Sequence, residues 1–200
     1  MKRRTLFAAC IAAQLSLSAP MSRAQAPEPP IDASLVRELR AGAVVMLRHT
    51  QTDPGVGDPP GWRLEDCKSQ RNLDALGNAH AQRIGRWFAQ QGLAVGNVRN
   101  SPWCRTRATA RLAFGRSDDW AALANIFEDR SGVEAQAAAA RQAIEATPPG
   151  QLAMWVSHGV TIDQIVGGAG AGLAQGEAIV VRRGSQPGAL PVALGRLRVP

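Results

Sequence analysis

The spacing of apolar and polar residues predicts a chain in which strands and helices alternate. Two continuous apolar runs, 43–47 and 152–156, predict strands buried on both faces, as in parallel sheets. Weaker apolar stretches predict further strands at 95–100, 178–182 and 192–199. Helices are expected over 33–40, 73–91, 102–114, 131–146 and 160–166. The pattern therefore predicts an α/β protein with a largely parallel sheet.

Two of the predicted helices begin at recognisable start signals. Ser101 and Pro102 predict an N-cap and a first-turn proline, and Ser131 with Glu134 fits a capping box. The first of these starts would place Arg105 in the first helical turn. Free backbone N–H groups and the helix dipole favour an anion at that position.

Histidines follow both of the strongly predicted strands. Arg48 and His49 come directly after the first strand, and His158 follows the second. Ligands of parallel α/β sheets bind outside the carboxyl ends of the strands, so both histidines are expected to face one crevice. The third histidine, His80, has the apolar spacing of a helix residue and is interpreted as structural.

Arg48, Arg105 and His158 are expected to converge around His49. A neutral imidazole among hydrogen-bond donors suits a nucleophile that faces a phosphoryl group, because such donors stabilise the charge that develops in the transition state. No carboxylate or thiolate cluster has the spacing of metal ligands, and neither a metal nor another cofactor is expected.

The start of the chain has the pattern of a secretory signal. Residues 1–26 combine a basic beginning, an apolar stretch and Ala-Gln-Ala before Pro27. We therefore expect a periplasmic or secreted protein without a stable membrane anchor, since the apolar stretch is too short to span a bilayer. Residues 27–42 are expected to form a lead-in with a helix, and residues 43–200 one compact domain.

Charge argues little for a nucleic-acid partner. Four of the 23 basic residues lie in the predicted signal, so 19 remain against 16 acids and the formal net charge falls from +7 to +3. All the remaining basic residues except Lys68 are arginines, which suit bidentate contacts with phosphate. A small phosphorylated substrate is therefore expected, and nucleic acid is not.

Cys67 and Cys104 are the two cysteines that follow the predicted signal. An even number in an oxidising compartment favours a disulfide bridge between them. The alternative is a free Cys104 thiol beside Arg105 that acts as a nucleophile. No sequence motif that combines cysteine with histidine supports that alternative.

The Pro- and Gly-rich segment 51–70 predicts a long loop, and long loops in compact domains are usually functional. With segment 118–129, it is expected to set substrate specificity. Trp62, Arg63 and Trp120 in these segments suggest stacking on, or hydrogen bonding to, a polar leaving group such as a sugar. Alternatively, both tryptophans pack beneath the loops.

Four ordered motifs resemble the histidine phosphatase superfamily, which includes the phosphoglycerate mutases. The resemblance covers about residues 43–168. The motifs are Leu47-Arg48-His49-Thr50, Arg71-Asn72-Leu73-x-x-x-Gly77, Ser101-Pro102-x-x-Arg105-Thr106-x-x-Thr109-Ala110 and Ser157-His158-Gly159.

The resemblance implies a three-layer α/β/α sandwich and a phosphohistidine intermediate on His49. It further implies that Arg48 and Arg105 clamp the phosphate and that His158 is the second histidine of the phosphate pocket. Thr50 stands where the family commonly has glycine, and we assign it to the substrate pocket.

The proton-donating acid of the family has no obvious counterpart. In the stretch 123–129, Asn125 stands at the position where the family usually has glutamate. Glu128 and Asp129 are alternative donors, and water or the substrate itself are others. The preferred leaving group therefore stays open.

The short chain leaves little room for the large cap of the acid phosphatases and phytases in this superfamily. Its layout is similar to that of small periplasmic members such as the lipopolysaccharide core heptose phosphate phosphatase. The sequence therefore predicts a metal-independent phosphomonoester hydrolase acting on a small envelope phosphomonoester. The alternative is a catalytically weak or inactive periplasmic protein that binds an anion.

Overall fold

The computed structural model describes residues 31–199. The predicted signal at 1–26 and the beginning of the lead-in lie outside the described residues. Within the described part of the chain, no helix combines the length and apolar character needed to cross a membrane.

A six-stranded mixed sheet forms the centre of the fold, in the order β3-β2-β4-β1-β5-β6. The four strands β3, β2, β4 and β1 run parallel, whereas β5 is antiparallel to β1 and β6 is antiparallel to β5. The predicted, mostly parallel sheet is thereby confirmed. The strands span Ala43–Arg48 (β1), Val95–Asn100 (β2), Asp118–Asp119 (β3), Leu152–Ser157 (β4), Glu177–Arg182 (β5) and Val192–Arg198 (β6).

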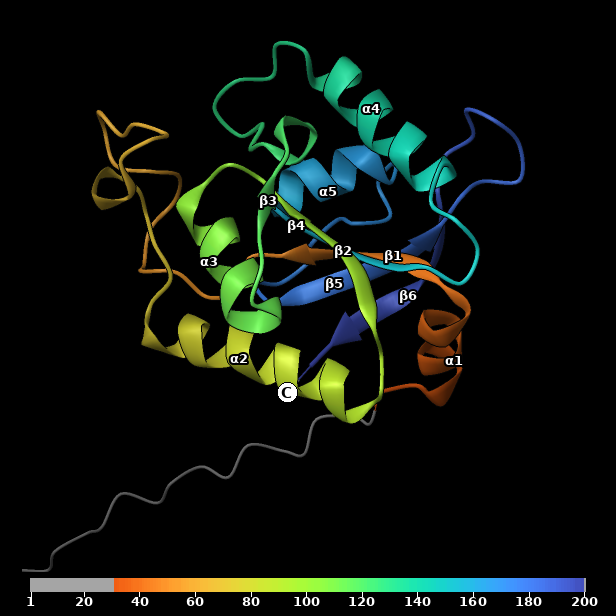
Figure 1. The fold of residues 1–200 in the computed structure, drawn as a ribbon. Helices are drawn as coiled ribbons and strands as arrows, with labels where there is room; N and C mark the ends of the chain where they lie inside the picture. Colours follow the sequence, from red (N-terminus) through yellow and green to blue (C-terminus); the bar gives the residue numbers. More distant parts are fainter. Residues whose placement is uncertain (1–30, 200) are drawn as a thin grey trace, which may run out of the picture.

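Helices cover both faces of this sheet. Figure 1 shows α4 and α5 above the sheet and α1 and α2 below it. Helix α3 shares the core of α1 and α2 through its buried Ala110. The predicted three-layer α/β/α fold is confirmed. The helices span Ala33–Ala41 (α1), Ala75–Gln90 (α2), Cys104–Phe114 (α3), Val133–Glu145 (α4) and Gly159–Ile165 (α5), with single 3-10 turns at Cys67–Ser69 and Ala121–Leu123.

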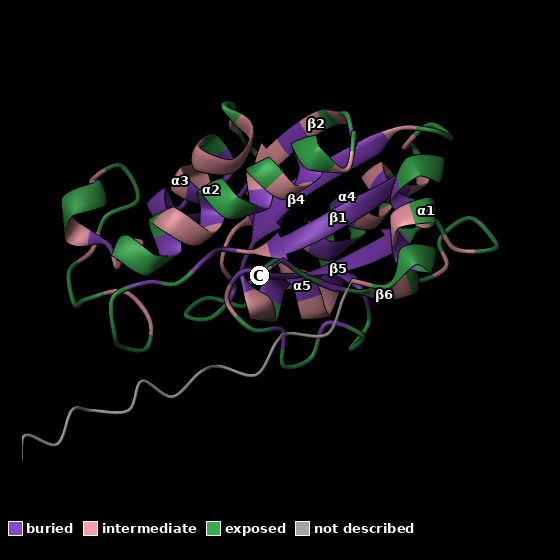
Figure 2. Ribbon diagram, turned by 90° about the horizontal axis from the view of Figure 1, so that it is seen from below, coloured by how far each residue is buried: buried purple, intermediate pink, exposed green. Residues whose placement is uncertain are grey.

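Strands β1 and β4 are buried on both faces, as their continuous apolar runs predict. Alternate residues of β1 point into different cores: Val45 packs with α1 and α2, whereas Val44 packs with α4 and α5. Figure 2 shows the sheet as a buried layer between helices whose outer surfaces are exposed. Burying a Val, Leu or Ile side chain contributes about 1.5–3 kcal/mol. The two strands that precede His49 and His158 are therefore firmly held.

Both predicted helix starts are wrong in their capping. Helix α3 begins at Cys104, with Trp103 as the N-cap and no side-chain capping bond. The Ser101 hydroxyl instead lies 2.9 Å from His158 Nε2. The hydroxyl also accepts from Trp103 N at 3.4 Å, but Trp103 precedes the helix, so Ser101 contacts the residue that follows β4 and does not cap α3.

Helix α4 begins at Val133, after Gly132 in the left-handed region at a φ of 72°. The predicted capping box is absent there. Ser131 is exposed, and Glu134 Oε1 accepts a hydrogen bond of 2.9 Å from Gln164 Nε2 on α5. The Glu134 side chain therefore bonds to the neighbouring helix α5 instead of capping its own helix.

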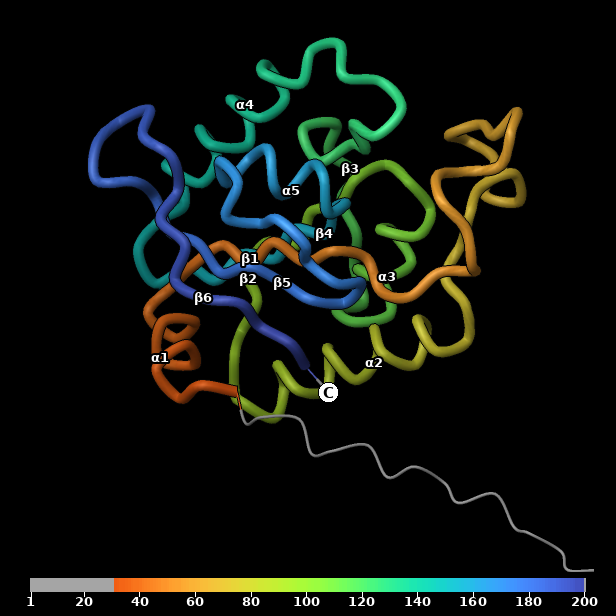
Figure 3. Tube along the Cα trace, turned by 180° about the vertical axis from the view of Figure 1, so that it is seen from behind, coloured from red at the N-terminus to blue at the C-terminus, as the bar shows by residue number. Residues whose placement is uncertain are grey.

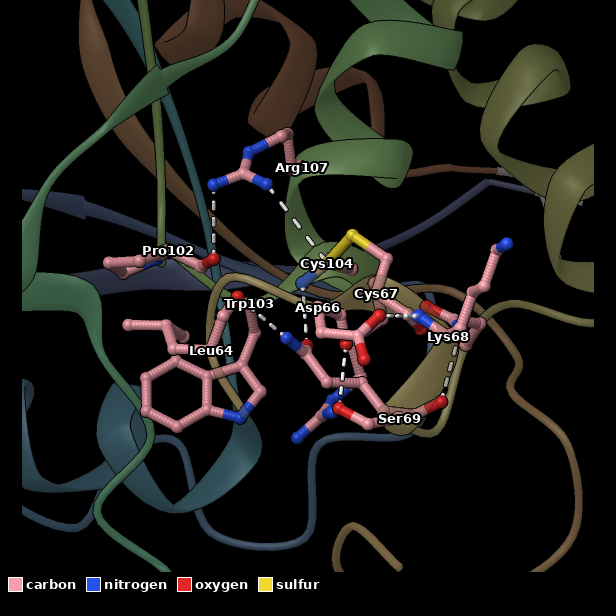
Figure 4. The surroundings of a disulfide bond; sticks show 12 residues. Leu64, Asp66, Cys67, Lys68, Ser69, Pro102, Trp103, Cys104 and Arg107 are labelled. Carbon is pink, nitrogen blue, oxygen red and sulfur yellow. Dashed lines mark hydrogen bonds between the residues drawn. A yellow bond between two sulfur atoms is a disulfide. The ribbon is translucent and has the colours of Figure 1, made fainter. Parts of the chain in front are cut away.

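The predicted loop at 51–70 lies next to α3, as both Figure 1 and Figure 3 show. A disulfide between Cys67 and Cys104, with a Cα–Cα distance of 5.6 Å, joins the loop to the first residue of α3. Figure 4 shows this bridge beside Trp103 and Arg107. The predicted bridge is confirmed, so the Cys104 sulfur is not a free nucleophile.

Candidate active site

A cavity of about 370 Å³ opens where β1 and β4 end. The structure brings together here four residues that the sequence singles out: Arg48, His49, Arg105 and His158. The other residues that line it are Gly55, Val56, Gly57, Arg71, Asn125, Phe127, Gly159, Val160, Gly172, Leu173 and Gln175. A larger cavity of about 530 Å³ lies at the other end of β1, around Gly42. It contains no histidine, so we place the chemistry in the smaller one.

His49 directly follows β1, and its backbone N–H donates a hydrogen bond to the Ser157 carbonyl at 3.0 Å. The ring is oriented by its own neighbour, because His49 Nδ1 lies 2.9 Å from the Thr50 carbonyl oxygen. A carbonyl only accepts hydrogen bonds, so Nδ1 carries the proton and Nε2 keeps a free lone pair. Burial lowers the pKa of His49 to about 3. The ring is therefore neutral near pH 7, as a nucleophile must be.

Thr50 positions this histidine from outside the cavity. Its side chain is buried, and Thr50 N donates a hydrogen bond of 3.2 Å to Thr109 Oγ1. Thr109 Oγ1 in turn donates to the Arg105 carbonyl at 2.8 Å. The predicted contact of Thr50 with substrate is not seen in the lining of the cavity, and its carbonyl instead orients the His49 ring.

His158 lies beside His49, with 5.5 Å between the ring centroids. It is buried, and its Nε2 contacts the Ser101 hydroxyl. Burial first, and then the nearby His49 and arginines, hold the pKa of His158 well below its usual value. A neutral second histidine therefore lies next to His49.

Three arginines line the cavity and point to an anion as its ligand. Arg48 Nη1 donates to the Leu173 carbonyl at 2.6 Å, and Arg71 Nη1 donates to the Gly55 carbonyl at 2.7 Å. The buried Nε atoms of Arg48, Arg71 and Arg105 have no hydrogen-bond partner among the described residues. Burial and mutual repulsion lower the pKa of Arg48, and burial with the charge of Arg105 lowers that of Arg71. A phosphoryl dianion would relieve this repulsion and accept from these donors.

The terminal nitrogens of Arg105 are held by Asp58. Nη1 and Nη2 donate to the two carboxylate oxygens at 2.7 and 3.1 Å, and both side chains are only 1% exposed. Asp58 also accepts from Arg71 N at 2.9 Å and from Trp103 Nε1 at 3.1 Å. Burial acts to raise the pKa of Asp58, but the hydrogen bonds from Arg105 and Arg71 hold it below its usual value.

Sequence reasoning missed Arg71 and Asp58 as site residues. Arg71 had a signal, since it opens the second of the four ordered motifs. No local sequence pattern marks Asp58 as a site residue, because it lies in a loop rich in proline and glycine. Its partner Arg105 is 47 positions away along the chain.

Three predicted specificity residues do not line the cavity. Arg63 is exposed and forms an ion pair with Asp66 at 3.2 Å. Trp62 packs against Trp103, with 5.3 Å between ring centroids. Trp120 packs against the buried Trp155 on the α4 and α5 side of the sheet, at 5.2 Å. The alternative interpretation, in which both tryptophans pack beneath the loops, is the one that the geometry supports.

The two candidate proton donors also lie outside the lining of the cavity. Glu128 Oε2 accepts a hydrogen bond of 2.9 Å from Trp62 Nε1. Asp129 is exposed and accepts from Ser131 N at 2.8 Å, and its hydrogen bonds to Ser131 lower its pKa. Asn125 does line the cavity, with its Oδ1 accepting from Phe127 N at 3.2 Å. No Asp or Glu is among the lining residues.

Among residues 31–199, no group of three or more His, Cys, Asp and Glu is arranged to hold a metal ion. The positive charge that faces the cavity comes from its arginines. The charge of an anionic ligand bound here would therefore be neutralised by guanidinium groups.

No protein-family model and no curated protein sequence matches the chain. Solved structures do match. The product of an open reading frame of Mycobacterium tuberculosis, Rv3214, has a TM-score of 0.59 at 18% identity, over 80% of this chain and 99% of the other. Phosphoserine phosphatase from Entamoeba histolytica has a TM-score of 0.56 at 12% identity, over 78% of this chain and 96% of the other. The protein histidine phosphatase SixA, complexed with tungstate, has a TM-score of 0.54 at 13% identity, over 78% and 96%.

These similarities define the class of fold. The chain has the fold of the histidine phosphatases, with an identity to each of the three structures that is below 20%. The fold was expected from four short motifs, and the structural matches confirm it.

Proposed function

We propose that the protein is a phosphomonoester hydrolase that acts through a phosphohistidine on His49 and needs no metal ion. The observation that carries the proposal is the orientation of His49. The Thr50 carbonyl holds Nδ1 at 2.9 Å and leaves Nε2 free, in a cavity lined by three arginines. Structural similarity to enzymes described as phosphatases adds support.

In the first step, His49 Nε2 attacks the phosphorus atom. The phosphorus–oxygen bond to the leaving group breaks, and its electron pair goes to the leaving oxygen. Arg48, Arg71 and Arg105 donate to the equatorial phosphoryl oxygens and stabilise their charge in the transition state. Because the arginines are already in place, little reorganisation is needed when the charge develops.

In the second step, water attacks the phosphorus atom of phosphohistidine. The phosphorus–nitrogen bond breaks, its electron pair returns to His49 Nε2, and inorganic phosphate leaves. His158 is neutral and lines the same cavity, and we assign it as a hydrogen-bond donor to a phosphoryl oxygen in both steps. Ser101, which lies 2.9 Å from His158 Nε2, fixes the second ring.

The substrate is a small phosphomonoester, in keeping with a cavity of about 370 Å³. That the protein meets this substrate in the cell envelope rests on the predicted signal at residues 1–26 alone. Mass spectrometry of the protein from its producing cell tests the localisation. An N-terminus near Pro27 is expected, and an intact Met1 on most molecules would refute export.

A second candidate function is a periplasmic protein that binds phosphate or a phosphorylated ligand without turnover. The lining without Asp or Glu favours it, because no general acid is in place. The presence of a free nucleophilic nitrogen on His49 favours hydrolysis instead.

Phosphate release from a panel of phosphomonoesters separates the two functions. Wild type and His80→Gln, a histidine variant outside the cavity, are expected to release phosphate, and His49→Ala to release essentially none. Rapid quenching of wild type should trap a protein that carries one phosphoryl group at His49. Binding of phosphate without turnover would support the second function, and full turnover by His49→Ala would refute the mechanism.

A further inference from the structure

The cavity changes character between its base and its mouth. Its base carries Arg48, Arg71 and Arg105, whereas three apolar side chains lie exposed at its edge. Val56 is 85% exposed, Phe127 52% and Val160 40%. These three come from different parts of the chain, and each is a lining residue of this one cavity. A group attached to a bound phosphoryl group would therefore meet an apolar surface.

Apart from the three arginines, the two amide side chains of the cavity lining, Gln175 and Asn125, already form hydrogen bonds within the protein. Gln175 Nε2 donates to Thr52 Oγ1 at 3.1 Å, and Asn125 Oδ1 accepts from Phe127 N at 3.2 Å. A sugar needs several free donors and acceptors for its hydroxyl groups, and each hydroxyl left unpaired on burial weakens binding. The mouth of the cavity is therefore better suited to a hydrocarbon ring than to a polyhydroxylated group.

No carboxyl group lines the cavity to protonate a departing oxygen. Glu128 lies beside the lining residue Gly57 but is not itself a lining residue, and its Oε2 accepts from Trp62 Nε1; Asp58 is the ion-pair partner of Arg105. Without a general acid from the protein, a leaving group on a phosphoryl dianion departs as its anion, because the dianion carries no proton to transfer. Phenols have a pKa of about 10, like tyrosine. Aliphatic alcohols are far weaker acids, with a pKa close to that of water.

We propose that the preferred substrate class is the aryl phosphate monoester, whose leaving group is both apolar and a stable anion. This inference rests on the proposed phosphohistidine function. His49 Nε2 forms the bond to phosphorus while the phosphorus–oxygen bond breaks. The electron pair leaves on the phenolic oxygen as phenolate, which then takes a proton from bulk water.

A matched set of substrates tests separately the two parts of the inference, which are the acidity of the leaving alcohol and the apolar character of its ring. Phenyl phosphate and cyclohexyl phosphate have apolar rings of similar size but differ in the acidity of the leaving alcohol. Glucose 6-phosphate has an aliphatic alcohol and a polar ring. We expect kcat/KM for phenyl phosphate to exceed that for cyclohexyl phosphate at least about 100-fold, the lower range of the contribution of a general acid. The kcat/KM for cyclohexyl phosphate should in turn exceed that for glucose 6-phosphate.

Two variants test the missing acid. Asn125→Glu places a carboxyl group in the cavity lining, and it should raise kcat/KM for cyclohexyl phosphate relative to phenyl phosphate at least tenfold. The gain should grow as the pH falls towards 5, where more of the new carboxyl group is protonated. Glu128→Gln should leave the ratio of the two substrates within about twofold of wild type. A large loss of cyclohexyl phosphate turnover in Glu128→Gln would identify Glu128 as the donor and overturn the inference.

The apolar mouth is tested by Phe127→Ser. It should raise KM for phenyl phosphate with little effect on kcat, and leave the inhibition constant of inorganic phosphate, which carries no ring to reach the mouth, nearly unchanged. A peptide carrying phosphotyrosine, assayed beside phenyl phosphate, shows whether the aryl phosphate is free or attached to a protein.

Failure of this inference is distinguishable from failure of the proposed function. One outcome is turnover that depends on His49 but prefers glucose 6-phosphate or a phosphohistidine peptide over phenyl phosphate. That outcome would contradict the aryl phosphate class and leave the proposed phosphohistidine function intact. Equal kcat/KM for phenyl and cyclohexyl phosphate would do the same. No phosphate release from any of these substrates would instead contradict the proposed function.

Discussion

Asp58 and Arg105 form a buried ion pair in which both carboxylate oxygens accept from the terminal guanidinium nitrogens, at 2.7 and 3.1 Å. The pair joins the loop at 51–70 to helix α3, close to the Cys67–Cys104 bridge that joins the same two segments. It holds the guanidinium of Arg105 in one orientation at the wall of the cavity. If Arg105 binds phosphate as proposed, Asp58 is its positioning residue.

Asp58→Asn should weaken both stability and catalysis. The substitution leaves Arg105 as a buried cation without its counterion, and breaking such a pair costs about 3–5 kcal/mol. We expect a lower free energy of unfolding in urea and a lower kcat/KM with a fold that is retained. Glu65→Gln, which removes an exposed ion pair in the same loop, is the control and should change neither quantity. Wild-type kcat/KM in Asp58→Asn would contradict the positioning role.

Arg71→Met tests the arginine that sequence reasoning did not assign to the site. Methionine keeps much of the apolar stem but removes the charge and the Nε donor. Loss of one transition-state donor should lower kcat/KM roughly 100-fold, about 2.7 kcal/mol. Steady-state kinetics of phosphate release measure this loss, with Arg86→Met on the exposed surface of α2 as the control. A change below about threefold would show that Arg71 does not contact the phosphoryl group.

The two buried histidines should make the protein less stable as the pH falls. Their pKa in the unfolded chain is about 6.5. Burial lowers the folded value to about 3 for His49 and well below 6.5 for His158. The unfolded state thus binds more protons below pH 6.5, and stability that is complete above this pH is lost as the pH falls.

Each histidine contributes a slope that approaches about 1.4 kcal/mol per pH unit below pH 6. Urea unfolding between pH 7.5 and pH 5 measures the combined slope. His49→Asn removes one of the two groups and should roughly halve it. An unchanged slope in His49→Asn would show that His49 binds protons equally in the folded and unfolded states.

The Cys67–Cys104 disulfide should contribute to stability through the 37-residue separation that it closes. Disulfides typically contribute about 2–4 kcal/mol, and more for longer loops. The double variant Cys67→Ala/Cys104→Ala should therefore unfold at a lower urea concentration than wild type. Reducing agent should lower the midpoint of wild type but not that of the double variant. Equal midpoints for both proteins under oxidising conditions would contradict a stabilising bridge.

The sequence by itself determined those features that depend on local pattern. Continuous apolar runs placed β1 and β4 nearly to the residue, because strands buried on both faces leave no polar alternation to obscure them. The same runs placed His49 and His158 at strand ends. Parallel pairing of β1 with β4, with Arg48 opposite Ser157, then made the two histidines neighbours.

Only the tertiary structure decided which partner each polar side chain takes. Ser101 has the local pattern of an N-cap, yet its hydroxyl contacts His158, 57 positions away. Trp62 and Trp120 have the pattern of ligand-stacking residues, yet each packs against another tryptophan. Asp58 meets Arg105 only because the loop at 51–70 passes over α3. Such pairings depend on the free energy of groups brought together by folding, which local spacing along the chain does not encode.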